Sequence, residues 1–536
     1  MIADQAEREE AGEHGRSELG PGPRAMRLKR VLAIAGIVVA VLAVAGVGVA
    51  VYLHHALQSD PFTPLYVNNC AVCHGESLEG AAQGPALVGR ELLHGESVAE
   101  LVRSIAEGFP ERGMPGWAGP LNEGEVRSLA ILIAERRVDR RFTDFKVDKT
   151  LILPAAPVET ELATFRIETV VSGLDPLVFS IAPLPDGRIL LTEKVRGLSV
   201  IEADGERSDP VAGTPETSGF GVNVLGLDYG LGWLLDVAPH PAYADNGWIY
   251  LVHTDLCPAC RSGGGEALMP STMVRLIRGR LNGNRWVDEE VVWSVPEAFY
   301  SSIPDIAAGG RLAFAPLDYV FVSVGIKGHG NYVGIQDLTT PYGKIHRVHD
   351  DGRIPVDNPF VARPGAMPSI WSYGHRSPQG LEFDAARGVL WGTEMGPRGG
   401  DEVNLLHPGR NYGWPLYSKG VDYDGTPVEY WKELGLEFRL ADIEQPVVDL
   451  TPSPAVSSFV IYKDDAFPQW RGQLIVGSLK ATELYRIVVD GDRHVHTEIL
   501  LRDLARIRDV EIDVAGNVLL LLEHASGSRI VRLTPV

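Results

Sequence analysis

Cysteine and positive charge are both scarce in this sequence of 536 residues. Its four cysteines form two C-x-x-C pairs, which are too few for a scaffold held together by disulfides. Lys and Arg total 49 against 70 Asp and Glu, so the formal net charge is −21. Because nucleic-acid binding needs a basic face, this balance argues against a nucleic-acid partner. The length predicts several domains, and the 45% of hydrophobic residues suffices for packed cores.

One long apolar run, Val31–Leu53, stands near the N-terminus. As a helix rising about 1.5 Å per residue, it spans a hydrocarbon core of about 30 Å. Lys and Arg residues cluster just before it and Asp60 is the first charge after it, so the positive-inside rule puts the N-terminus in the cytoplasm. We expect a disordered cytoplasmic tail over 1–30, a transmembrane anchor over 31–53 and a periplasmic or other extracytoplasmic location for the rest. A cleaved signal peptide is the alternative, although its apolar region is usually only about 7–15 residues.

The segment 60–141 has the pattern of a small helical domain. Apolar residues recur with helical spacing over Val98–Glu107 and Glu123–Arg136, and the second pattern places Val126, Leu129, Ala130 and Ile133 on one face. Residues 142–162 have little periodicity and contain prolines. They are predicted to be a linker.

Strand-like runs bounded by Gly, Pro and Asp fill the remainder, 163–536. A unit made of an apolar lead-in, a turn and a β run recurs in it. Six copies in a segment of this length leave room for about four short strands each, which predicts a six-bladed β-propeller. A β-sandwich offers similar strand spacing but does not explain the recurrence. The copies are at 181–193, 237–253, 313–325, 383–394, 466–480 and 511–523.

The first pair of cysteines belongs to a C-x-x-C-H motif, Cys70-Ala-Val-Cys73-His74. In such a motif the two thiols form thioethers with haem and the His becomes an axial iron ligand. Gly84-Pro85 and the loop around Met114-Pro115 follow it. Together these features resemble the small mono-haem cytochrome c family, and the resemblance implies that Met114 is the second axial ligand of a covalent haem c. His/Met ligation suits electron transfer.

Other interpretations of these residues remain open. Cys70 and Cys73 could form a disulfide, and His94 is a rival to Met114 as iron ligand. The second pair, Cys257-Pro-Ala-Cys260, lacks a following His. A small disulfide is the simpler interpretation for it outside the membrane, and a metal site is the alternative.

Cations stand out at the ends of the predicted blades of this acidic chain. Where loops of several blades meet, gathered cations can bind a polyanion through charge-assisted hydrogen bonds, although each could instead pair locally with Asp or Glu. The strings G-H-R-S-P-Q-G, G-P-R-G-G-D-E and R-I-R-D resemble the soluble glucose and aldose (sorbosone) dehydrogenase family, which uses pyrroloquinoline quinone (PQQ). The resemblance implies that the tricarboxylate quinone faces Arg376, Gln379, Lys480, Arg506 and Arg508.

The same resemblance implies Ca²⁺. Backbone oxygens of Gly396 and Pro397 would hold the ion that polarises the quinone. Glu402, Tyr412 and Asp422 match a second, structural calcium site. Oxygen ligands of this kind suit Ca²⁺.

The sequence departs from this family at the general base. The family's N-H-x-G-G-R-L string reads Ile306-Ala307-Ala308-Gly-Gly-Arg-Leu here, so Ala307 replaces the His. Leu231 replaces a substrate-orienting Gln, and Ser377 replaces an Asn. A missing base commonly costs about 10²–10⁴ in rate. His329 and His253 are the candidates for a substitute base. Either could equally be an ordinary loop or core histidine.

Together these patterns predict a membrane-anchored quinohaemoprotein oxidoreductase. A sugar, polyol or aldehyde would reduce PQQ in the propeller, and electrons would pass through haem to a respiratory acceptor. The alternative is a non-catalytic propeller that binds a carbohydrate or a protein partner beside an electron-transfer cytochrome.

Overall fold

The computed structural model describes residues 60–140, 145–149, 151–219, 221–224, 227–257, 260, 270–326, 332 and 334–536. The predicted tail and membrane anchor, 1–53, lie outside these ranges. Within them, no helix combines the length and the apolar character of a membrane span.

Helices fill the part of the chain that carries the C-x-x-C-H motif. Both helices predicted from periodicity are present, and each starts at a capping box, formed by Ser97 with Glu100 and by Asn122 with Glu125. The elements are α2 (Phe62–Asn69), α3 (Ala71–His74), α4 (Val98–Glu107), η1 (Pro110–Arg112) and α5 (Glu123–Arg137).

Helix α5 is buried on all sides. The predicted apolar face is inside, but Ile131, Leu132 and even Glu135 are also at most 2% exposed. A helix covered all round must pack against two partners. One is α4, and the other is a loop of the propeller, whose Val421 belongs to the same apolar cluster. The sequence pattern showed only the first of these two faces.

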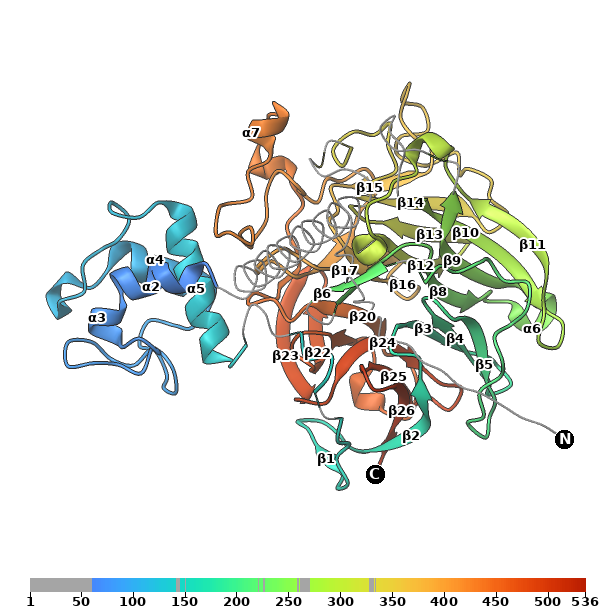
Figure 1. The fold of residues 1–536 in the computed structure, drawn as a ribbon, viewed down its shortest axis with the longest axis horizontal. Helices are drawn as coiled ribbons and strands as arrows, with labels where there is room; N and C mark the ends of the chain where they lie inside the picture. The colour runs from blue at the N-terminus through green and yellow to red at the C-terminus, as the bar shows by residue number, and fades with distance from the viewer. Residues whose placement is uncertain are drawn as a thin grey trace, which may run out of the picture. The chain divides into compact units, whose positions relative to one another are not determined.

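The rest of the described chain forms a six-bladed β-propeller, as predicted. In Figure 1 the sheets lie around a centre made by β3, β8, β12, β16, β20 and β24. Each of these inner strands packs against the next, and β24 packs against β3, so the ring is closed. All strand pairs within the blades are antiparallel, which suits blades joined by short turns.

The first three blades contain strands in simple sequence order. A separate hairpin, β6 (Gly221–Val224) with β7 (Leu227–Gly230), precedes the second blade. The strands are β3 (Val178–Pro183), β4 (Ile189–Glu193), β5 (Gly197–Ile201); β8 (Leu234–Pro239), β9 (Ile249–Cys257), β10 (Ser271–Leu281), β11 (Trp286–Trp293); and β12 (Gly309–Ala315), β13 (Tyr319–Val324), β14 (Lys344–His349), β15 (Ile370–Tyr373).

The last three blades include the one that closes the ring. Strand β2 from the start of the propeller pairs with β26 from the end of the chain, and β1, from the predicted linker, extends this sheet. The strands are β16 (Pro378–Asp384), β17 (Val389–Glu394), β18 (Glu402–Leu406), β19 (Val448–Asp449); β20 (Val456–Ile461), β21 (Leu474–Ser478), β22 (Leu484–Asp490), β23 (Arg493–Leu501); and β24 (Arg506–Ile512), β25 (Val518–Glu523), β26 (Ser528–Pro535), β2 (Thr164–Leu174), β1 (Val158–Glu159).

The six sequence repeats correspond to one recurring part of the blades. Five of them cover the turn from an inner strand into the second strand, as in β3–β4 and β24–β25. The copy at 466–480 covers the approach to β21 and the strand itself. Short helices occupy connections: α6 (Tyr243–Asn246), η2 (Glu297–Phe299), η3 (Asp305–Ala307), α7 (Trp431–Leu434), η4 (Leu440–Asp442) and η5 (Pro468–Trp470).

Candidate functional site

The C-x-x-C-H motif lies where α2 meets α3. Cys70 is the junction residue, and its carbonyl accepts hydrogen bonds from the backbone N–H groups of Cys73 (3.1 Å) and His74 (3.0 Å). The two cysteines are free thiols, so the alternative of a disulfide between them is wrong. One helical turn therefore presents two thiols and an imidazole together, as covalent haem attachment requires.

The ring of His74 is oriented by a backbone carbonyl. Its Nδ1 lies 2.8 Å from the oxygen of Pro85. Because a carbonyl only accepts, Nδ1 must carry the proton, and Nε2 keeps its lone pair for a metal. The residues thus fit a haem: two thiols for the vinyl groups and a pre-oriented ligand for the iron. Pro85 belongs to the Gly84-Pro85 segment that supported the cytochrome resemblance in the sequence.

The two rivals for the second axial position lie on opposite sides of α4 in the sequence, and both contact Phe109. Met114 is half-buried, and its backbone N–H and C=O bond those of Phe109 at 3.1 and 2.8 Å. The ring of His94 stacks on Phe109 with centroids 4.1 Å apart. That stacking gives His94 a packing role of its own, whereas the Met114 side chain has no polar partner to engage. Met114 therefore stays our predicted ligand.

Substitution of these two residues separates them. We expect Met114→Ala to lower the haem midpoint potential by on the order of 100 mV, because a thioether ligand raises the potential. His94→Ala, the matched control, should leave the potential unchanged. Redox titration of the purified chain measures both. A larger shift in the His94 variant would make His94 the ligand.

Arg376, one of the predicted quinone ligands, is partly buried and bonds to the turn after β17. Its Nη1 donates to the carbonyl of Gly396 at 2.8 Å, and its Nη2 donates to the hydroxyl of Tyr423 at 3.1 Å. Its Nε is buried without a hydrogen-bond partner. An orphaned N–H on a buried guanidinium is costly unless an acceptor arrives. This site therefore fits an anionic ligand such as a carboxylate of PQQ.

Arg506 and Arg508 share one carboxylate. Glu523 on β25 accepts from Arg506 Nε at 2.9 Å and from Arg508 Nε at 2.6 Å. The interpretation that these cations pair locally is thus partly correct, but two guanidinium groups on one carboxylate still leave a positive charge. Gln379, the remaining polar residue of the set, donates to Ser377 Oγ at 3.0 Å and is buried.

This triad predicts an acid-sensitive stability. Burial raises the pKa of Glu523, but Arg506 and Arg508 together lower it to about 2. Because this value lies below that of an unfolded Glu, about 4.3, the pairing stabilises above about pH 4.3 and is lost as the pH falls toward 2. We expect the wild-type chain to lose on the order of 2–3 kcal/mol of unfolding free energy across this window. Urea titrations at several pH values should show a shallower loss for Glu523→Gln; equal slopes would contradict the prediction.

Lys480 lies near a carboxylate from the helical domain. Its Nζ is 3.8 Å from Glu135 Oε1, and Glu135 also binds Arg398 through Nη2 to Oε2 at 2.6 Å. The Lys480 side chain is 13% exposed, whereas those of Glu135 and Arg398 are at most 2% exposed. Neither Glu135 nor Arg398 was singled out in the sequence. The one feature of the sequence that could have pointed to this pair is a Glu that follows the apolar residues of α5.

The predicted calcium ligands have separate partners. The Gly396 carbonyl accepts from Arg376, as described above, and Pro397 is buried in the turn after β17. Burial, reinforced by Glu394, raises the pKa of Glu402 to about 8, so a cation would have to displace its proton.

The two other predicted ligands of the structural calcium site are also hydrogen-bonded. Tyr412 donates to the carbonyl of Leu405 at 2.6 Å, and Asp422 accepts from the hydroxyl of Tyr430. In the described parts of the chain no hydrogen bond or ion pair joins Glu402, Tyr412 and Asp422 to one another. Both calcium sites remain predictions.

The position of the missing base ends a short helix. Ala307 closes η3, after Asp305, which is buried and accepts from Gly232 N and from the hydroxyls of Thr254 and Thr272. Asp305 therefore shapes the loop. Of the other substituted positions, Leu231 is buried at 1% exposure, and Ile306 is 41% exposed.

One substitute base can be described. His253 on β9 is 4% exposed, and its Nε2 has no hydrogen-bond partner. Burial lowers its pKa to about 4, so the ring is neutral at neutral pH. His329 lies outside the described residues. Neither candidate is shown to act as a base, and both remain predictions.

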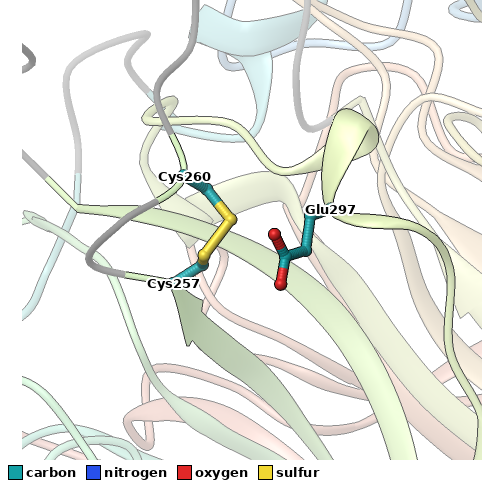
Figure 2. Close-up of side chains that lie close together, drawn as sticks. All are labelled: Cys257, Cys260 and Glu297. Atoms are coloured by element: carbon teal, nitrogen blue, oxygen red, sulfur yellow. A yellow bond between two sulfur atoms is a disulfide. The ribbon is translucent and has the colours of Figure 1, made fainter.

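The second cysteine pair forms a disulfide, as predicted. Cys257 and Cys260 are bonded, with Cα atoms 5.2 Å apart. Figure 2 shows the carboxylate of Glu297 beside the two sulfurs, and the ligand atoms of all three residues lie within 4.8 Å of one another. Sulfurs joined in a disulfide are not thiolate ligands, so this arrangement does not support the metal alternative.

Comparison with known proteins agrees with both domains. The family model "Glucose / Sorbosone dehydrogenase" matches residues 175–532, and "Cytochrome C oxidase, cbb3-type, subunit III" matches 60–133. The aldose sugar dehydrogenase YliI of Escherichia coli (strain K12) is 33% identical over 382 residues, which are 70% of this chain and 94% of that protein. The crystal structure of the soluble aldose sugar dehydrogenase of Escherichia coli in its apo-form superposes with a TM-score of 0.58 at 31% identity, covering 70% of this chain and 100% of that one.

The helical domain has relatives of its own. The cbb3-type cytochrome c oxidase subunit CcoP of Azospirillum brasilense is 36% identical over 75 residues, which are 13% of this chain and 25% of that protein. These matches agree with the geometry of the haem motif and with the closed ring of blades. The chain belongs to the glucose/sorbosone dehydrogenase family, and it carries a cytochrome c domain in front of the family's six-bladed propeller.

Proposed function

We propose that the protein is an extracytoplasmic quinohaemoprotein dehydrogenase, anchored to the membrane by residues 31–53. It oxidises an aldose or a related polyol or aldehyde and delivers the electrons to a respiratory acceptor. When bound, PQQ and Ca²⁺ supply two-electron oxidation chemistry and haem c supplies one-electron transfer. The chain's own residues bind these groups and fix the distance between them.

The main support for this proposal is that α2 runs from the propeller to the C-x-x-C-H motif. Phe62 at its start lies under Arg398, with the guanidinium carbon 3.6 Å from the ring centroid. Phe62, Tyr66 and Cys70 follow at intervals of four residues and so share one face of the helix. The helix rises about 12 Å over these eight residues.

This face links the two proposed redox sites. Arg398 lies two residues beyond Gly396, whose carbonyl holds Arg376. Tyr66 is 1% exposed and donates its hydroxyl to the carbonyl of Gly75 at 2.8 Å, so the path is buried and rigid. A short buried connection from the quinone pocket to a haem cysteine supports electron transfer within the chain.

The residues of the pocket have separate tasks in this proposal. Arg376 and Lys480 bind anionic groups, and the Arg506–Glu523–Arg508 triad keeps a fixed positive potential beside them. His74, held by Pro85, is the ligand through which the haem receives its orientation. Substrate deprotonation lacks an assigned residue, because Ala307 has no proton acceptor.

The absence of a proton acceptor at position 307 favours a second possible function. Ala307, Ile306 and Leu231 replace polar residues of the family's catalytic site, which favours a propeller that binds a carbohydrate or a protein partner without turnover. In that case the cytochrome domain would be the only redox element.

One experiment distinguishes the two functions. Full-length ferric protein is loaded with PQQ and Ca²⁺ and mixed with a panel of aldoses, polyols and aldehydes while the haem spectrum is followed. Reduction of the haem that depends on both PQQ and a substrate supports the dehydrogenase. Failure to bind PQQ contradicts it, and PQQ binding without haem reduction by any substrate favours the binding module.

A further inference from the structure

We infer that Glu135, a residue of the cytochrome domain, sets the affinity of the propeller's anion pocket by partly neutralising Lys480. This inference rests on the proposed function, because it takes the quinone as the anion that Lys480 binds. It makes Glu135 a positioning residue that acts from a neighbouring domain. Binding of the cofactor and docking of the cytochrome would then be energetically coupled.

The geometry of the interface brings Glu135 to the pocket. Glu135 lies near the end of α5 and faces the turn after β17. Arg398 binds it as a fork, through Nε to Oε1 at 3.3 Å and Nη2 to Oε2 at 2.6 Å. The turn runs close to α5 at its next residue, where a Cβ on Gly399 would lie 3.2 Å from Ile131 Cδ1 and 3.0 Å from Thr451 Cγ2. The carboxylate is therefore held in place from both domains.

The two cations beside this carboxylate are held differently. Arg398 engages both of its oxygens, so Lys480 at 3.8 Å receives attraction but no hydrogen bond from it. Glu135 therefore reduces the positive potential at Lys480 without occupying its N–H groups. Burial lowers the pKa of Lys480, and Glu135 opposes this effect, together with Asp401, while Arg140 and Arg398 reinforce it.

Asp401 does not replace Glu135 in this role. Its carboxylate accepts from Gly396 N, Ser453 Oγ and Val456 N at 2.8–3.0 Å. These hydrogen bonds engage the Asp401 carboxylate in holding the turn after β17 in place. Glu135 is therefore the carboxylate whose removal most changes the potential at Lys480.

Removing the charge of Glu135 without changing its shape tests the inference. We expect apo Glu135→Gln to bind PQQ roughly tenfold more tightly than wild type at pH 6.5 with Ca²⁺, within the usual range of coupling between sites of about 5- to 150-fold. Equilibrium dialysis of full-length protein measures the dissociation constant. In a Lys480→Met background the same change should have no effect. Unchanged affinity in Glu135→Gln, or an equal gain without Lys480, would overturn the inference.

A matched control breaks a different contact between the same domains. Ser128 of α5 donates its hydroxyl to the carbonyl of Gly425 at 3.0 Å, also across the interface, and carries no charge. Ser128→Ala should loosen docking and leave the dissociation constant for PQQ within about twofold. An equal gain in affinity in this variant would mean that loosened docking is the cause, and the inference would fail.

A second measurement does not depend on the quinone. Acetylation of Lys480 over a pH series, read by mass spectrometry, reports the fraction of neutral amine. Loss of Glu135 should move the midpoint to lower pH, whereas the uncharged control Ser128→Ala should not. If wild type binds no PQQ, the proposed function fails, and an unmoved midpoint would then reject the link between Glu135 and Lys480 as well.

Discussion

Placing histidine at Ala307 is expected to raise the rate at which an aldose reduces the haem by about 100-fold. The family's base is a His at this position, and a positioned base is commonly worth about 10²–10⁴ in rate. We expect the low end of that range, because Leu231 and Ile306 still lack the polar groups that orient substrate and base. The measurement is stopped-flow reduction of the haem in the PQQ-loaded full-length variant.

Two features of the structure favour this outcome. Ala307 is only partly buried, and the helix that it ends is fixed by the three hydrogen bonds to Asp305. A larger side chain at 307 therefore extends from a loop that is already rigid. Ala307→Gln is the control, since it adds similar bulk without a base at neutral pH. An equal gain in both variants would mean that volume, and not proton transfer, limits the reaction.

Replacing Arg398 with methionine should destabilise the cytochrome domain by about 3–5 kcal/mol, the usual cost of leaving one member of a buried ion pair without its partner. Among the described residues, Glu135 would keep Lys480, at 3.8 Å, as its cationic neighbour, and Phe62 would lose the guanidinium above its ring. Urea unfolding of the full-length protein, followed by the haem absorption, measures the change.

Arg127→Met supplies the comparison for this prediction. Arg127 also crosses the interface, but its Nε donates to the uncharged carbonyl of Lys419 at 2.8 Å, and within the described ranges no carboxylate forms an ion pair with it. Its loss should cost about 1 kcal/mol. Similar losses in the two variants would show that the buried charge of Glu135 has no special cost, and would also weaken the inference about Lys480.

The sequence predicted the elements better than it predicted the contacts between them. Helices α4 and α5 and the recurring strand pairs have local signals, namely apolar spacing, capping residues and turns, and these were confirmed. The Glu135–Arg398 pair joins residues 263 positions apart, and no local pattern encodes that distance. Ile131 lay outside the predicted face of α5 for the same reason, because it packs near Gly399 of the distant propeller loop.

The candidate site shows the same division. The motif Cys70–His74 implied its own chemistry, and Pro85 was already in the supporting segment. The sequence suggested Arg506 and Arg508 as pocket cations but not their shared carboxylate partner, because Glu523 lies on the next strand of the blade. Only the folded chain shows that Arg506 and Arg508 share it while Arg376 keeps an unpaired N–H.

The pairing of β2 with β26 has a consequence for how the protein is made. The propeller ring closes only when the last residues, Ser528–Pro535, have been synthesised. They follow the end of α5 by roughly 400 residues, which take about 20–80 s at about 5–20 residues per second. During that time the cytochrome domain exists without the loop that covers Ile131 and Glu135. Its outer α5 face is then exposed, so haem attachment during synthesis would act on a domain whose final helix is not yet covered.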